Sequence, residues 1–172
     1  MAQNIANVGP VGPATGMQYY PVGYSAPALA ATTTAATLVS GTTIFTITGG
    51  PLLVTNLVSL CVTANDTTAS TIRWSADATI GGTATTFTGA SATLASLAAG
   101  DMVICNFTAL ATAPDIMSTG TSAALGAILT RGIILQAGII TTTIAVGLTT
   151  GTWNHILSYV PLSSLTVVTP AF

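Results

Sequence analysis

Acid–base catalysis needs titratable side chains, and this sequence contains very few. His155 is the only histidine, and a hydrolytic triad could be drawn only by combining it with Asp101 and one of the serines. The G-x-S-x-G turn that presents the nucleophilic serine of many hydrolases does not occur. A lone histidine on a strand is more often structural, so the sequence predicts no catalytic residues and no enzyme activity.

The carboxylates are too scattered to predict a metal site. Asp66, Asp77, Asp101 and Asp115 all fall at expected turns or strand starts, where aspartate commonly caps the chain. No D-x-D-x-D spacing suggests a calcium loop. The glycine pairs at 49–50 and 81–82 lack the surrounding pattern of a phosphate-binding loop. We therefore expect no metal and no cofactor.

The two cysteines, Cys61 and Cys105, both fall in expected strands. They could form a disulfide if those strands face each other. Two buried free thiols are the favoured interpretation, because cysteine commonly serves as a small core residue. No C-x-x-C or Cys/His cluster suggests zinc.

Charged residues make up only 3% of the chain, against about 25% in a typical soluble domain. There are two arginines, four aspartates, no lysine and no glutamate. Two isolated arginines cannot neutralise a phosphate backbone, so we expect no nucleic-acid partner. An uncharged surface does little to repel other copies and loses little when it is desolvated. The composition therefore favours a subunit that is buried against copies of itself or other proteins.

The mean hydropathy of +0.76 raises the question of a membrane span. The most apolar stretch, residues 123–148, is interrupted by Arg131, Gln136 and three threonines, and it is rich in glycine and β-branched residues. It predicts strands rather than a spanning helix of about 20 apolar residues. The N-terminus lacks the basic and apolar regions of a secretory signal, so we expect neither membrane insertion nor export by that route.

Residues 1–38 are expected to form an extended N-terminal arm. The segment contains four prolines and four glycines before a run of alanine and threonine, a composition that disfavours helices and central strands. Tyr19, Tyr20 and Tyr24 are the candidate anchors of this arm, because tyrosine buries a large ring and keeps a polar hydroxyl. The arm could fold back on its own domain or lie across a neighbouring subunit.

Residues 39–172 are expected to form a domain of short strands separated by turns. Thr42–Thr48 and Leu52–Ala64 flank a Gly-Gly-Pro breaker. In the second strand we expect an apolar face of Val54, Val58, Leu60 and Val62, with Thr55, Ser59 and Thr63 opposite. Ile72 and Trp74 share a face of the next strand. Further strands are expected at 83–88, 101–107, 132–136, 139–148, 153–160 and 165–169. Residues 90–99 are expected to form one or two helical turns, and 114–126 a loop.

Alternation is clearest in the last third of the chain. Ile140, Ile144, Val146 and Leu148 are expected to line one face of a strand. Residues 153–160 place Trp153, His155, Leu157 and Tyr159 on one side. Short strands with frequent turn residues and little helix predict an all-β sandwich of the jelly-roll kind.

Two stretches resemble structural proteins encoded by tailed bacteriophages. Residues 44–63 (IFTITGGPLLVTNLVSLCVT) are similar to their opening strands, and residues 133–168, ending in TTGTWNHILSYVPLSSLTVV, to their final hairpin. The resemblance implies a virion protein, most like a capsid cement or decoration protein. Such proteins are typically β-sandwich homotrimers with arms that clasp their neighbours, so the implied partners are self and the major capsid protein or other virion subunits. It implies a virion location after assembly in the host cytoplasm, and it carries no catalytic residues over.

Two alternatives remain open at this point. The chain could be a tail, neck or fibre protein of the same particle. It could also be a carbohydrate-binding or adhesive module, for which exposed Trp74, Trp153, Tyr19 and Tyr20 would be the candidate platforms. For the capsid role, we expect deletion of residues 1–35 to abolish shell binding without unfolding the domain.

Overall fold

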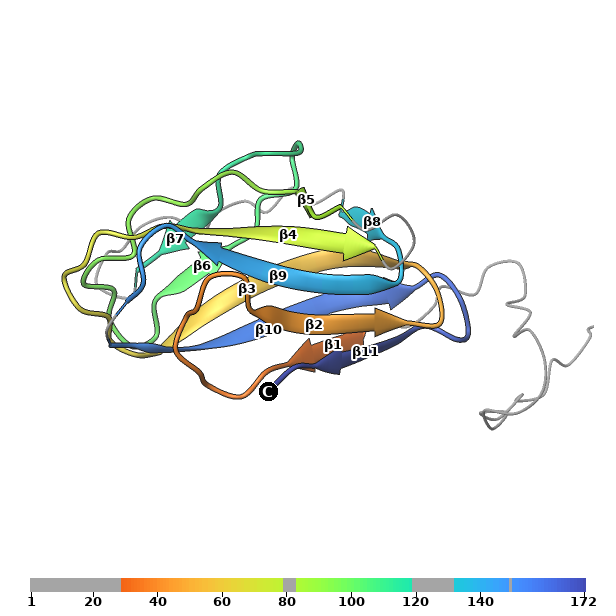
Figure 1. The fold of residues 1–172 in the computed structure, drawn as a ribbon, viewed down its shortest axis with the longest axis horizontal. Coiled ribbons are helices and arrows are strands. Elements are labelled where there is room, and N and C mark those ends of the chain that lie inside the picture. Colours follow the sequence, from red (N-terminus) through yellow and green to blue (C-terminus); the bar gives the residue numbers. More distant parts are fainter. Residues whose placement is uncertain (1–28, 79–82, 119–131, 149) are drawn as a thin grey trace, which may run out of the picture.

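The structure, a computed structural model, describes residues 29–78, 83–118, 132–148 and 150–172. Within these ranges the chain is all-β and contains no helix. Its strands form two antiparallel sheets that face each other as a sandwich, with sheet B in front of sheet A in Figure 1.

Sheet A is centred on the two longest strands, β3 (Leu52–Thr63) and β10 (Thr152–Pro161). The strand order is β1-β10-β3-β6-β7, and β8 also pairs with β3. The outer members are β1 (Leu29–Thr32), β6 (Met102–Ile104), β7 (Asp115–Met117) and β8 (Ile133–Leu135). These shorter strands extend the sheet on both sides of the central pair.

Sheet B has the order β11-β2-β9-β4-β5. Its strands are β2 (Thr43–Thr48), β4 (Ile72–Ala78), β5 (Thr85–Thr86), β9 (Gly138–Ile144) and β11 (Val167–Pro170). β2 and β9 are rich in threonine and isoleucine, β-branched residues that suit a pleated strand.

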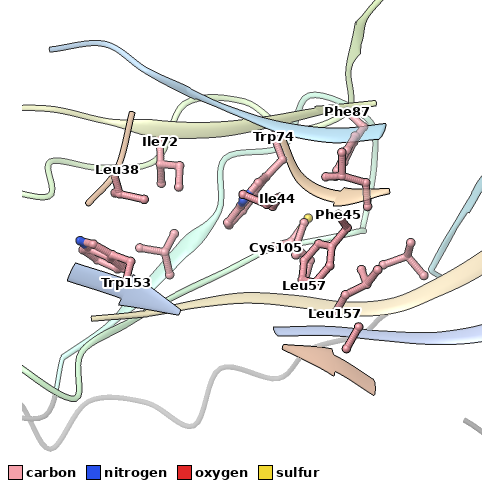
Figure 2. Packing of buried hydrophobic residues seen from close by; sticks show 14 of the residues in the cluster. Leu38, Ile44, Phe45, Leu57, Ile72, Trp74, Phe87, Cys105, Trp153 and Leu157 are labelled. Carbon is pink, nitrogen blue, oxygen red and sulfur yellow. The ribbon is translucent and has the colours of Figure 1, made fainter. Parts of the chain in front are cut away.

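Alternating apolar side chains from both sheets form one core. Trp74 of β4 and Trp153 of β10 are fully buried, and Figure 2 shows them with Phe45 and Leu57 in the space between the sheets. The expected inward faces of β4 and β10 are therefore confirmed. The core is a single cluster to which strands of both sheets contribute.

The apolar face expected for β3 is correct at Val54 but wrong for the rest of the strand. Val54 points inward, but Leu57, Ser59 and Cys61 are the buried residues further along the strand. A bulge causes the change: Tyr159 pairs with Val54 and the adjacent Ser158 pairs with Asn56, so β3 has one extra residue. An extra residue exchanges the two faces of the strand, which places Val58, Leu60 and Val62 on the outer side.

The expected helical turns at 90–99 are also wrong. The backbone amides of Ser91 and Leu94 donate to the carbonyls of Ile72 and Ser70, so the segment is tied to the β4 side of the sandwich. Leu94 and Leu97 are buried in the core. Tertiary hydrogen bonds thus replace the local ones that a helix would make.

Three smaller boundaries differ from expectation. The expected loop at 114–126 begins with β7, the weak strand at 83–88 shortens to β5, and Val146 is 51% exposed beyond the end of β9. Residues 29–38, assigned by sequence to the arm, contribute β1 and the buried Leu38 to the sandwich. The remainder of the expected arm lies outside the described residues.

Asn65 joins three parts of the sandwich from the buried start of the β3–β4 connection. Its Oδ1 accepts a hydrogen bond of 3.0 Å from Nε1 of Trp153, and its Nδ2 donates one of 2.8 Å to the carbonyl of Leu94. We expect Asn65→Ala to lower the free energy of unfolding by about 2 kcal/mol or more, because two buried polar groups lose their partners.

Urea denaturation measures this loss, with Asn106→Ala as the matched control. The amide of Asn106 makes only solvent-exposed hydrogen bonds, to Asp115 and Thr108. Its replacement should cost less than about 1 kcal/mol. Equal losses of unfolding free energy in the two variants would show that the buried hydrogen bonds of Asn65 add no more stability than exposed ones.

Candidate interaction surface

The one histidine lies inside the sandwich. His155 is 2% exposed, and its Nδ1 is 2.7 Å from Oγ of Ser59 on the neighbouring strand β3. The ring of Phe172 packs edge-on against the imidazole, with 6.4 Å between ring centroids. Burial lowers the pKa of the imidazole from 6.5 to about 4, so the ring is neutral at pH 7. Ser59 is fully buried as well, so this Ser–His pair has no surface at which a substrate could bind.

The aspartates serve mainly as local braces. Asp66 accepts hydrogen bonds from the amides of Thr68 and Thr150 and so holds a turn, as expected. Asp101 is buried before β6, where its carboxylate accepts from the amide of Ala98 and the hydroxyl of Ser118. Asp115 begins β7, within the segment that was expected to be a loop. Asp77 does not lie at a turn, because it is inside β4.

Both cysteines are buried and free, which confirms the favoured interpretation. Burial raises the pKa of the Cys105 thiol to about 12, and burial also raises that of Cys61. Neither thiol is therefore poised to act as a nucleophile at neutral pH. Among the described residues, no three His, Cys, Asp or Glu side chains are grouped as a metal site would require.

The outer face of sheet A carries an apolar patch. Strand pairing places Val58 beside Ile156 and Ile104, Leu60 beside Met102, and Leu53 beside Val160 and Ile134, all on the side away from the core. Exposure ranges from 61% for Ile134 to 8% for Val58 and 6% for Ile104. Asn56, Asn154 and Ser158 lie on the same face, so polar side chains interrupt this apolar patch. An apolar patch on an outer face is typical of an interaction surface.

The outer face of sheet B is rich in hydroxyl groups and is called the threonine face here. Its members are the outward residues of β2, β4, β5, β9 and β11: Thr43, Thr46, Thr48, Arg73, Ser75, Asp77, Thr86, Ile139, Thr141, Thr143, Val167 and Thr169. Figure 1 shows the strands that carry this face in the foreground. One row runs across four strands and joins Thr43, Thr141, Ser75 and Thr86. Each of these side chains has a hydroxyl that can donate and accept.

None of the described aromatic residues expected from the sequence to form a site lies on the threonine face. Tyr19, Tyr20 and Tyr24 lie outside the described residues. Trp74 and Trp153 are buried in the core, so the expectation that they are exposed platforms for a sugar is wrong. The threonine face was not predicted from the sequence, although the many threonines in residues 43–48 and 141–143 were the available signal.

No family model matches the chain, and searches of curated proteins and of solved structures found no matching protein. Among the described residues there is no helix long and apolar enough to cross a bilayer.

Proposed function

We propose that this chain is a structural virion subunit that binds and stabilises a capsid shell, as a cement or decoration protein, and that its sandwich is a jelly roll. The observation that carries the proposal is the nesting of its strand pairs. In a jelly roll, eight strands pair first with last, second with seventh, third with sixth and fourth with fifth. This architecture is common in viral capsid domains and lectins.

The observed pairs follow that order. β1 pairs with β10, β2 with β9, and β4 with β5. β3, the third strand, pairs with both β6 and β8. These two short strands lie along different parts of β3 and together take the place of the sixth strand. β7 and β11 are then additions at the edges of the two sheets. The nested order supports a jelly roll over a simple meander.

The surface chemistry supports a subunit that is permanently in contact with others. The outer face of sheet A carries an apolar patch, and the threonine face can exchange hydrogen bonds with water for hydrogen bonds with a partner. Neither process requires many ions to be desolvated. Contacts repeated over a shell would add through multivalency, so each contact can be weak. A homotrimer remains the predicted form of the free protein.

We expect that deleting residues 1–28 abolishes shell binding and preserves the fold. The deletion ends before Leu29, because residues 29–32 form β1 and pair with β10. It removes Tyr19, Tyr20 and Tyr24, the proposed anchors. Co-sedimentation with undecorated shells measures binding, and circular dichroism checks the fold. A second variant with the three tyrosines replaced by alanine tests the anchors alone. If the deleted form still occupied shells fully, residues 1–28 would not be needed for shell binding and the proposed role of the arm would be wrong.

Copy number tests the location. A purified particle that contains hundreds of copies of this chain supports the shell, whereas a handful of copies supports a tail or neck protein. A chain that is missing from particles but binds specific glycans on an array would favour the adhesive alternative.

A further inference from the structure

Two of the few charged residues lie on the same strand and the same face. Arg73 and Asp77 are both on the outer side of β4, with Ser75 midway between them. Within the described ranges, Arg73 is the only lysine or arginine. The rest of the threonine face, as defined above, carries no charge.

Among the described residues, neither side chain has a partner of opposite charge. Arg73 is exposed, and in the described part of the chain no ion pair or hydrogen bond involves its guanidinium. Oδ1 of Asp77 is shielded from solvent and has no hydrogen-bond donor. Asp77 as a whole is only half-buried. A guanidinium from outside the chain could therefore meet the accessible part of its side chain and compensate its charge. The two residues are too far apart to pair directly, since four residues of a strand span about 13 Å.

We propose that the threonine face packs against the same face of a second copy, about a two-fold axis that runs along the row of Thr43, Thr141, Ser75 and Thr86. Such an axis lies across the strands and reverses their direction in the second copy. It exchanges the position of Arg73 with that of Asp77, because the two are equally spaced on either side of Ser75. Each Arg73 then faces Asp77 of the second copy, and the contact contains two equivalent ion pairs.

The dimensions of packed sheets allow this pairing. Two sheets in face-to-face contact lie about 10 Å apart, a gap that a long arginine side chain and a short aspartate side chain can span together. Twisted sheets cross at about 30°, which moves residues about 7 Å from the axis by roughly 3 to 4 Å. The flexible arginine side chain can absorb such a displacement.

The hydroxyl row is self-complementary for the same reason. On a two-fold axis Thr43, Thr141 and Thr86 each meet their own counterpart, whereas Ser75 is only 5% exposed and lies behind them. A hydroxyl can act as donor to one neighbour and acceptor from another. Oγ of Ser75 and Oγ1 of Thr86 are already 3.1 Å apart within one chain. The second copy would extend this pair into a network across the contact.

The size of the face sets the expected strength. Twelve outward residues cover about 400 Å² in projection, from the strand spacing and the rise per residue. That is small beside the roughly 800 Å² per partner of a standard interface, so the contact should be reversible and dependent on concentration. It deepens the proposed function, and rests on it, by naming one contact between copies. Combined with a trimer, it would join trimers in pairs.

Charge reversal in the full-length protein tests the contact. We expect Arg73→Asp and Asp77→Arg each to weaken self-association by about tenfold or more in sedimentation equilibrium, because like charges then face each other. An equimolar mixture of the two variants should associate like the wild type. One variant carries two negative residues on the face and the other carries two positive ones, so opposite charges meet in the mixed dimer. The double variant with both charges exchanged should also associate. Raising the salt concentration should weaken the wild-type contact.

The mixture decides between this contact and any other role of these residues. If both variants stay dissociated when mixed, although their circular dichroism and melting are those of the wild type, the two-fold contact is wrong. Leu110→Arg, at an exposed position between β6 and β7 and outside both sheets, is the control and should associate normally. These measurements need no shell, so failure of shell binding with normal association would overturn the proposed function and leave the contact intact.

Discussion

Lowering the pH from 7 to 4 is expected to reduce the free energy of unfolding by about 3 kcal/mol through His155 alone. Burial lowers the pKa of this imidazole to about 4 in the folded chain, against 6.5 when it is exposed. Between these values the unfolded chain binds a proton that the folded chain does not. The stabilisation is therefore complete above pH 6.5, declines as the pH falls, and is lost near pH 4.

The described residues that contact His155 offer no compensation for a positive charge. The imidazole contacts the hydroxyl of Ser59 and the ring of Phe172. The backbone amide of His155 donates a hydrogen bond to the hydroxyl of Thr33. None of these side chains is ionisable. Protonation would therefore leave an unpaired charge in the core, and its cost of about 3 kcal/mol is a substantial fraction of the 5 to 15 kcal/mol stability typical of a domain.

Urea denaturation at a series of pH values measures the effect, with His155→Gln as the comparison. The variant should be less stable at pH 7, because glutamine packs differently, but its stability should depend much less on pH between 6.5 and 4. An unchanged slope in the variant would assign the pH dependence to other groups. A wild-type protein equally stable at pH 4.5 and 7 would mean that the imidazole is not buried in its neutral form.

Replacing Gly49 by alanine is expected to cost about 4 kcal/mol, from backbone strain together with displaced hydrogen bonds. Gly49 ends β2 with a φ of 76°, a conformation that side chains disfavour, and an added Cβ would overlap the backbone carbonyl of Leu165. The loop after β10 would have to move. That loop is held by the amide of Leu162 and the hydroxyl of Thr166, which both donate to the carbonyl of Pro51.

Gly41 provides a matched control for this prediction. Its φ is 78°, but an added Cβ would meet no atom within 4 Å. Gly41→Ala should therefore lose only the conformational part, about 1 kcal/mol. The shift of the denaturation midpoint at constant slope measures both variants. Similar losses at the two positions would show that the loop accommodates the extra methyl group.

The sandwich was largely predictable because its signals are local. Alternation along residues 153–160 identified the buried face of β10, and Ile72 and Trp74 identified that of β4. The Gly-Gly-Pro sequence separated β2 from β3. In each case a property of neighbouring residues was enough, since the side chains of a strand alternate between its two faces.

The candidate surface was less predictable because it depends on strand register. The sequence indicated a contact surface through its low charge, but not where that surface lies. Arg73 and Asp77 belong to the threonine face only because β4 pairs with β9 in a register that sets them beside Thr143 and Ile139. Which residues of different strands share a row is a property of their pairing, and no single segment contains it.

By itself, the amino-acid sequence determined that the chain would be all-β, where many of its strands would lie, and that its surface would be nearly free of charge. Only the tertiary structure decided which side of β3 faces the core, that residues 90–99 bond to strand backbones rather than form a helix, and that His155 is held neutral beside Ser59. The reason is physical. Composition and alternation act within a few residues, whereas a bulge, a backbone bond between distant segments and the burial of an imidazole exist only once separate strands have paired and packed.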